Sequence, residues 1–262
     1  MRELDQALVG HPRVAIDAVA IVGHGRLGTA IASALTHVGI AVDGPYQRRD
    51  PVIAAAARVD AVLLCVPDAE IAAVAAAIAP GAPVGHCSGA TGLDALGAHA
   101  GFSLHPLMTV PADARRGALA GAGAAVAAST PRAAAVAWTL AELLRMRPIE
   151  IADDDRAAYH AAASIASNFL VTLEGAAERV AATAGLPREL LAPLVRATVD
   201  NWARLGAEQA LTGPVARGDA ETVRRQRAAV QARVPELLEL FDALAAATER
   251  LAAPGRDEAV AA

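Results

Sequence analysis

The stretch from Val19 to Leu35, VAIVGHGRLGTAIASAL, constrains the fold more than any other part of the sequence. It opens with four apolar residues, typical of a short buried strand, and ends as an alanine-rich segment without proline, typical of a helix. Between the two, Gly23, Gly25 and Gly28 follow the spacing G-x-G-x-x-G. Such a motif alone is a weak signal in a chain rich in alanine and glycine. Its place between a strand and a helix is what indicates a nucleotide site.

Each glycine of the motif has a mechanical role in a dinucleotide fold. The first permits a tight turn, the second lets the backbone approach a pyrophosphate, and the third lets the helix pack against the strand. The helix start then directs unpaired N–H groups and its positive dipole end at the phosphates. The predicted cofactor contacts of this loop are Gly23, His24, Gly25, Arg26, Leu27 and Gly28, with His24 acting through its backbone.

The overall composition excludes several classes of protein. The 262 residues are 55% hydrophobic but only 3% aromatic, which suits tight helix packing. We expect no membrane span, because no run of about 20 apolar residues is free of charge. The early charges of the N-terminus do not resemble a secretory signal. A net charge of −5 argues against a general nucleic-acid binder. Cys65 and Cys87 lie in apolar settings without metal-ligand spacing, which predicts a cytoplasmic protein with no metal.

The segment after the first helix bears on the choice between NAD and NADP. Gly39–Val42 is predicted as the second strand, and an NAD site usually carries an acidic residue near the end of this strand. The corresponding positions here hold Arg48 and Arg49, whose planar guanidinium groups match a ribose 2′-phosphate. Asp43 and Asp50 flank the segment, so a solvated basic turn is the alternative. The arginines favour NADP, with NAD as the other option.

Further strands alternate with helices up to about residue 151. Asp60–Val66, DAVLLCV, is a continuous apolar run typical of a parallel strand buried on both faces. We expect Asp68 to cap the helix that follows. Ligands lie beyond the carboxyl ends of parallel strands, so Val66, Pro67 and Ser88 are predicted to border the cofactor. The predicted class is α/β, with a Rossmann-like, doubly wound, mostly parallel sheet over residues 1–151.

From Asp153 onward the strand signals stop. Three aspartates precede a long helix, where negative charge is favourable. Gly185-Leu186-Pro187 interrupts the helical pattern, and Leu211–Asp219 is predicted as a loop between helices. Residues 152–262 are therefore predicted to form an all-α domain.

Six segments together resemble a known family: GHGRLG, LLCVPD, HCSGATG, SLHPLM, YHAAASIASNFLV and LTGPVARGD. The sequence resembles bacterial proteins with a Rossmann-like N-terminal domain and a DUF2520 C-terminal domain. These belong to the 6-phosphogluconate-dehydrogenase-like superfamily, alongside ketopantoate reductases, pyrroline-5-carboxylate reductases and prephenate dehydrogenases. The resemblance implies a helical domain that binds substrate and forms a homodimer. One departure is Gln226, where the family pattern has a histidine.

Three polar residues are predicted to share one face of the first helix of the second domain. His160, Ser164 and Asn168 are spaced i, i+4 and i+8 in an otherwise alanine-rich segment. In ketopantoate reductases the matching helix carries Lys-x-x-x-Asn, and the resemblance implies that Ser164-x-x-x-Asn168 is the counterpart. Without the lysine, His160 would relay the proton. The alternative is that Ser164 and Asn168 only bond across a helix interface.

A further histidine and an arginine complete the candidate site. His105 follows a predicted strand at the cofactor edge of the sheet, and a histidine can exchange a proton near neutral pH. SLHPLM resembles the His-Pro segment of prephenate dehydrogenases. The same resemblance implies that Ser88 matches the serine on the cofactor side of their site. The alternative is that His105 only tethers backbone at a proline turn. Arg217 is a candidate carboxylate clamp, while Asp219 either holds Arg217 or caps the next helix.

Together these features predict an NADP-dependent oxidoreductase that transfers a hydride to a small anionic oxo- or imino-acid, with reduction of the ketopantoate kind as the most concrete candidate. The predicted catalytic residues are His105, His160, Ser164 and Asn168. Two alternatives remain open at this point: an NADP-binding sensor without catalysis, and an enzyme similar to prephenate dehydrogenase.

Overall fold

The computed structural model describes residues 13–47, 58–111 and 117–260, with residues 254–260 described by their backbone alone. The chain divides into two compact units, Met1–Ser167 and Asn168–Ala262. The domain boundary expected at residue 152 precedes this division, which assigns the helix that follows Asp155 to the first unit. Each unit is described in turn.

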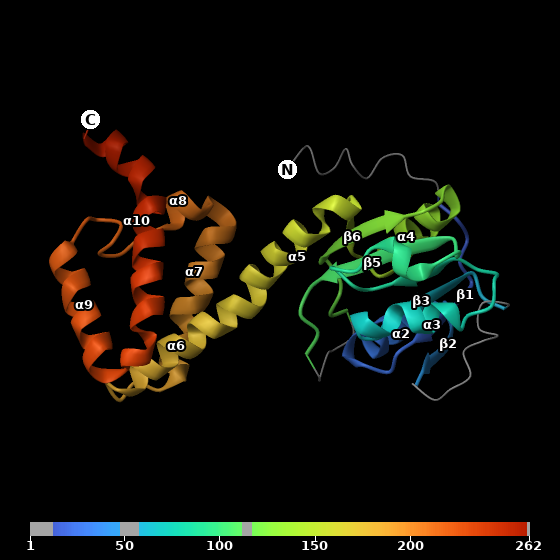
Figure 1. The fold of residues 1–262 in the computed structure, drawn as a ribbon, viewed down its shortest axis with the longest axis horizontal. Helices are drawn as coiled ribbons and strands as arrows, with labels where there is room; N and C mark the ends of the chain where they lie inside the picture. The colour runs from blue at the N-terminus through green and yellow to red at the C-terminus, as the bar shows by residue number, and fades with distance from the viewer. Residues whose placement is uncertain (1–12, 48–57, 112–116, 261–262) are drawn as a thin grey trace. The chain divides into compact units, whose positions relative to one another are not determined.

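One seven-stranded sheet forms the centre of the first unit, in the order β2-β1-β3-β4-β5-β6-β7 (Figure 1). All neighbouring strands are parallel except β5 and β6, which are antiparallel. This arrangement confirms the predicted mostly parallel, Rossmann-like sheet. The strands are β1 (Ala18–Val22), β2 (Ala41–Tyr46), β3 (Ala61–Leu64), β4 (Val84–His86), β5 (Gly101–Leu107), β6 (Gly123–Ala128) and β7 (Arg147–Glu150).

Strands β1 and β3 are buried on both faces, which explains why they appear in the sequence as continuous apolar runs. In β1, Val19 and Ile21 belong to one hydrophobic cluster, and Ala20 and Val22 belong to a second cluster. Successive strand residues point to opposite faces, so the two clusters lie on the two sides of the sheet.

Helices cover both faces of the sheet (Figure 1). The first cluster contains residues of α2 (Arg26–His37) and α4 (Pro131–Leu143), and the second contains residues of α3 (Ile71–Ala76) and η3 (Leu93–Leu96). Thr130 caps α4, because its side chain accepts a hydrogen bond from the backbone N–H of Ala133 at 3.1 Å. Pro131 in the first turn of α4 also favours a helix start at this position.

Two local predictions were wrong. His105 was expected to follow its strand, but β5 continues through it to Leu107 because antiparallel pairing with β6 sets His105 opposite Ala125. Asp68 was expected to cap a helix, but it begins the short 3-10 helix η2 (Asp68–Glu70) and makes no cap bond. Its carboxylate instead accepts a hydrogen bond from the Ser88 hydroxyl at 2.7 Å.

The end of the first unit and the second unit are helical. A 3-10 turn η4 (Asp153–Asp155) leads into α5 (Arg156–Ser164), followed by a π-helical segment, Ile165–Phe169. The second unit then contains α6 (Leu170–Ala182), α7 (Ala192–Leu205), α8 (Ala207–Ala210), α9 (Ala220–Arg233) and α10 (Leu238–Val260). Within the ranges that the structure describes, none of these helices combines the length and apolar character needed to cross a bilayer.

Candidate active site

The glycine loop between β1 and α2 is fixed by close backbone packing at two positions. Gly23 has a φ of +115°, and a Cβ added there would lie 2.2 Å from the carbonyl oxygen of Cys65. A Cβ added to Gly28 would lie 2.0 Å from the carbonyl oxygen of Gly23. These contacts leave no room for a side chain, as the tight turn and the close helix–strand packing of a dinucleotide motif require.

The middle glycine differs from the other two. A Cβ on Gly25 would meet no atom of the described residues within 4 Å, and its φ of −79° suits any residue. The packing of the described residues therefore does not require glycine at this position. Gly25 is the N-cap residue of α2, and no side chain in the described part of the chain caps the helix start. Open space at an uncapped helix N-terminus fits the close approach of a diphosphate.

Of the other predicted cofactor contacts, Val66 and Pro67 lie at the same edge of the sheet as the glycine loop. Val66 and Pro67 follow β3, which pairs with β1, and the backbone N–H of Cys65 donates to the carbonyl of Val22 at 2.7 Å. Arg48 and Arg49 lie outside the described residues. Their predicted contact with a ribose phosphate stays a prediction.

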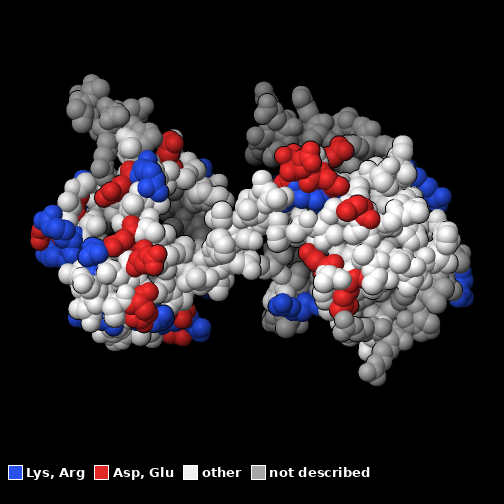
Figure 2. All heavy atoms as spheres, viewed as in Figure 1, with Lys and Arg blue, Asp and Glu red and all other residues white. Residues whose placement is uncertain are grey.

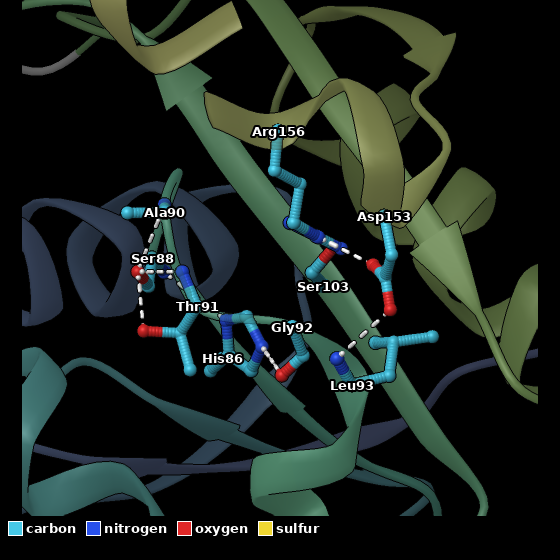
Figure 3. A network of polar contacts seen from close by, with 9 residues as sticks. All are labelled: His86, Ser88, Ala90, Thr91, Gly92, Leu93, Ser103, Asp153 and Arg156. Carbon is cyan, nitrogen blue, oxygen red and sulfur yellow. Dashed lines mark hydrogen bonds and ion pairs between the residues drawn. The ribbon is translucent and has the colours of Figure 1, made fainter. Parts of the chain in front are cut away.

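Ser88 organises the loop that follows β4 (Figure 3). Its hydroxyl accepts hydrogen bonds from the backbone N–H groups of Ala90 at 3.2 Å and Thr91 at 2.9 Å, and donates to Asp68. Ser88 is 6% exposed. These bonds shape the loop, while the predicted contact between Ser88 and a cofactor stays a prediction.

His86 is a structural residue in a single tautomer. Its Nδ1 lies 3.2 Å from the backbone N–H of Ser88, so Nδ1 accepts, and Nε2 donates to the carbonyl of Gly92 at 3.3 Å (Figure 3). Burial and then the nearby Arg156 guanidinium lower the pKa of His86 below 6.5. A neutral ring with both nitrogens bonded holds the two ends of the loop together.

His105 and two residues of α5 form a cluster of rings beside this loop. The Nδ1 of His105 lies 2.7 Å from the hydroxyl of Tyr159, and the rings meet edge to face with centroids 5.5 Å apart. The ring centroid of His160 lies 6.3 Å from that of His105. A Cβ on Gly89 would lie 2.9 Å from Cε1 of His105 and 3.0 Å from Cδ2 of His160. Gly89 therefore forms the wall against which both rings pack.

Arg156 ties the start of α5 to the sheet. It is 4% exposed, and its guanidinium donates to the Ser103 hydroxyl in β5 at 2.7 Å and to Asp153 at 2.5 Å (Figure 3). The other oxygen of Asp153 accepts from the backbone N–H of Leu93 at 3.4 Å. Acidic side chains gather where α5 begins, around Asp153–Asp155 (Figure 2). Tyr159 and His160 lie one helical turn after Arg156, so this anchor positions them.

The structure brings together only part of the predicted catalytic set. His105 and His160 are neighbours, and Ser164 lies one turn beyond His160 in α5. The π-helical segment begins directly after Ser164, so the regular α-helical spacing does not extend to Asn168. Asn168 and Arg217 are exposed residues of the second unit, and their predicted substrate contacts stay predictions. Asp219 caps α9 by accepting from the backbone N–H of Thr222 at 3.0 Å.

Sequence reasoning missed four residues of this cluster: Asp68 as a partner of Ser88, Gly89, Arg156 and Tyr159. Tyr159 and Arg156 did leave a signal, because both lie within one turn of His160 on the same predicted helix. Their partners in β5 are more than fifty residues away in sequence, and no local pattern points to that pairing. Across the described part of the chain, no group of three His, Cys, Asp or Glu side chains could hold a metal ion.

The protonation of His105 predicts how stability depends on pH. Burial, followed by the charge of His160, lowers the pKa of His105 from 6.5 to about 4. Between these two pH values the unfolded chain binds more protons than the folded chain. The contribution of neutral His105 to the free energy of unfolding is therefore fully present above pH 6.5 and declines as the pH falls toward 4. The limiting slope is about 1.4 kcal/mol per pH unit.

Urea unfolding followed from neutral pH to about pH 4 measures this slope. His105→Gln is expected to flatten it, because glutamine does not titrate. An identical slope in wild type and His105→Gln would contradict the assignment.

Comparisons with known proteins agree with the sheet and the helical region. Residues 123–248 match the family described as a domain of unknown function, DUF2520. No curated protein matches the chain.

Several solved structures share the fold. A protein from Bacteroides fragilis described as an NADP oxidoreductase is 20% identical, with a TM-score of 0.73, covering 89% of this chain and 98% of its own. A Thermotoga maritima protein is 22% identical, with a TM-score of 0.69, covering 91% and 99%. Pyrroline carboxylate reductase from Plasmodium falciparum, solved with NADP bound, is 12% identical, with a TM-score of 0.59, covering 92% and 100%. The chain thus has a Rossmann-like sheet, and its residues 123–248 are similar to the DUF2520 family.

Proposed function

We propose that this protein is an oxidoreductase that uses NADPH to reduce a small oxo- or imino-acid. The observation that carries the proposal is the open space at Gly25, between two glycines that the protein needs for its own packing. An unneeded glycine at a helix start is explained by a ligand that approaches the backbone there. The Plasmodium falciparum reductase has this fold and holds NADP, which supports the same choice of cofactor.

The residues of the first unit suit a reductive site. When bound, a reduced nicotinamide supplies a hydride, and the protein must then bind the substrate and stabilise charge on the accepting group. His105 lies in β5. The rings of Tyr159 and His160 and the backbone of Gly89 pack around its imidazole. Such a preorganised polar group in a partly buried place stabilises a developing negative charge better than water does.

The test is reduction of a panel of 2-oxo acids and cyclic imino acids, followed by the loss of NADPH absorbance. We expect turnover on at least one substrate, and His105→Gln is expected to reduce kcat about 100-fold. His37→Gln, a histidine at the far end of α2, serves as the matched control with unchanged turnover. Tight NADPH binding without turnover on any substrate would instead indicate a nucleotide-binding sensor.

Cofactor preference is tested separately, since it depends on Arg48 and Arg49, which lie outside the described residues. The double variant Arg48→Ala/Arg49→Ala is expected to weaken NADPH binding about 10- to 100-fold and NADH binding much less, because only NADPH carries a 2′-phosphate. Equal losses for both nucleotides would contradict a preference for NADP.

We also propose that the second unit forms a homodimer. Among its described side chains, only three hydrophobic ones are buried: Val230, Val234 and Ala252. Large apolar side chains remain exposed on its helices, including Val171 at 71%, Leu194 at 64% and Trp202 at 56%. A unit of this length normally buries a core, and a second copy with the same apolar surfaces supplies the missing contacts. Light scattering is expected to give twice the chain mass of 26.5 kDa, and a monomer would contradict the proposal.

A further inference from the structure

The hydrogen bond between Tyr159 and His105 joins residues 54 positions apart, from α5 and β5. The donor in this bond follows from the chemistry of the two groups. Burial raises the pKa of Tyr159, so the phenol keeps its proton at neutral pH. Burial also keeps His105 neutral, with a pKa of about 4. Among the described residues, the Tyr159 hydroxyl has no other hydrogen-bond partner, so its proton is directed to Nδ1 of His105.

A neutral imidazole that accepts at Nδ1 carries its own proton on Nε2. Within the described ranges, Nε2 of His105 has no hydrogen-bond partner. The ring is nevertheless held in place, because Gly89 packs against Cε1 and Nδ1, and Arg156 fixes the helix that carries Tyr159. The result is an immobilised ring with one N–H group left for a ligand.

We propose that Tyr159 is a positioning residue that fixes His105 in the Nε2–H tautomer, so that His105 donates a hydrogen bond to the carbonyl oxygen of an oxo acid. This inference rests on the oxidoreductase function proposed above and narrows its substrate class. A carbonyl oxygen accepts a hydrogen bond, whereas a protonated imine is itself a donor and would face the N–H group of His105 unfavourably. A neutral imidazole can stabilise a developing oxyanion in this way.

The reaction balances without a proton from His105. A hydride adds to the carbonyl carbon, the C=O π electrons move to the oxygen, and the Nε2–H group stabilises the charge there. A bound reduced nicotinamide would be the source of that hydride. Water would supply the proton that completes the hydroxy acid, and the hydroxide that remains would pass to solvent. His105 therefore keeps its proton throughout, as a neutral imidazole does.

Nitrogen-15 NMR of the full chain labelled at histidine tests the tautomer without cofactor or substrate. We expect Nδ1 of His105 to be unprotonated and Nε2 to be protonated in the wild type, with the signals assigned by their loss in His105→Gln. Tyr159→Phe is expected to give a mixture of both tautomers. His86 is an internal control, because backbone groups fix its tautomer and its signals should not change. Unchanged His86 signals also show that Tyr159→Phe is folded.

Two results would overturn the proposal: a proton on Nδ1 of His105 in the wild type, or the same single tautomer in Tyr159→Phe. In a turnover assay, Tyr159→Phe is expected to lower kcat for 2-oxo acids about 10-fold with the Kd for NADPH unchanged. Faster turnover of cyclic imines than of 2-oxo acids would refute the substrate class. Absence of all turnover would count against the proposed function, while the NMR result would still decide the role of Tyr159.

Discussion

Gly25→Ala is expected to weaken NADPH binding about 10- to 100-fold, or about 1.4 to 2.7 kcal/mol, without destabilising the protein. Within the described ranges the added Cβ meets no atom within 4 Å, and the backbone conformation at this position suits alanine. The methyl group instead occupies the space through which a diphosphate reaches the backbone of α2. Calorimetric titration measures the affinity, and urea unfolding without nucleotide measures stability.

The neighbouring Gly28→Ala is expected to behave differently. Its Cβ would lie 2.0 Å from the carbonyl oxygen of Gly23, so the loop or α2 must shift, and we expect a loss of about 3 kcal/mol of stability. Gly175→Ala is the matched control, because Gly175 lies in α6 with open space around it. It is expected to leave the NADPH affinity unchanged and to raise stability slightly, since alanine favours a helix interior more than glycine does. Equal NADPH affinity in wild type and Gly25→Ala would exclude the predicted approach of the diphosphate.

Arg156→Met is expected to lower the free energy of unfolding of the first unit by about 2 kcal/mol. Methionine keeps part of the buried stem but cannot donate to Ser103, whose hydroxyl is then buried without that partner. Asp153 is half exposed and regains water, so its contribution is small. Trp138 is 5% exposed in α4, and its fluorescence reports the first unit alone when Trp202 is replaced by phenylalanine.

A double-mutant cycle with Ser103→Ala tests whether the hydrogen bond itself is responsible. The double variant Arg156→Met/Ser103→Ala is expected to be about 1 kcal/mol more stable than the sum of the single effects predicts, because neither partner is then left unpaired. Additive effects would show that Arg156 stabilises α5 through packing alone.

The pH dependence of the same ion pair has a defined direction. The hydrogen bond from Arg156 lowers the pKa of Asp153 below 3.8. The contribution of the ionised Asp153 to the free energy of unfolding is therefore fully present above that pH. The contribution is lost only as the pH falls through the lowered value. Acid unfolding at milder pH therefore reports the buried histidines His105 and His86 rather than Asp153.

The sequence predicted the first unit well wherever function or burial leaves a local pattern. The run Asp60–Val66 contains β3 because a strand buried on both faces must be apolar throughout. The glycine spacing placed the turn before α2 because the packing at Gly23 and Gly28 excludes side chains. The full length of β5 was not predicted, because a proline such as Pro106 normally indicates the end of a strand. Pairing with β6 nevertheless continues the strand through Pro106.

The candidate site was only partly predictable for a related reason. His105 and His160 stand out as single residues, but their association depends on Arg156 meeting Ser103 across 53 positions of sequence. Likewise, Asp68 has the spacing of a helix cap and instead bonds a serine on the neighbouring loop. Long-range partners of this kind are set by the fold, and composition or spacing does not reveal them.

Titration of the unmodified protein with NADPH is the most direct measurement of the central claim, which is that a nicotinamide dinucleotide binds at the start of α2. Histidine-labelled protein in the same titration reports the position, because His24 lies in the loop and His99 bonds a carbonyl of α3 on the other face of the sheet. We predict saturation at one nucleotide per chain, with the His24 signals shifted and the His99 signals unchanged. No binding of NADPH or NADH, or binding that leaves His24 unaffected, would contradict the account.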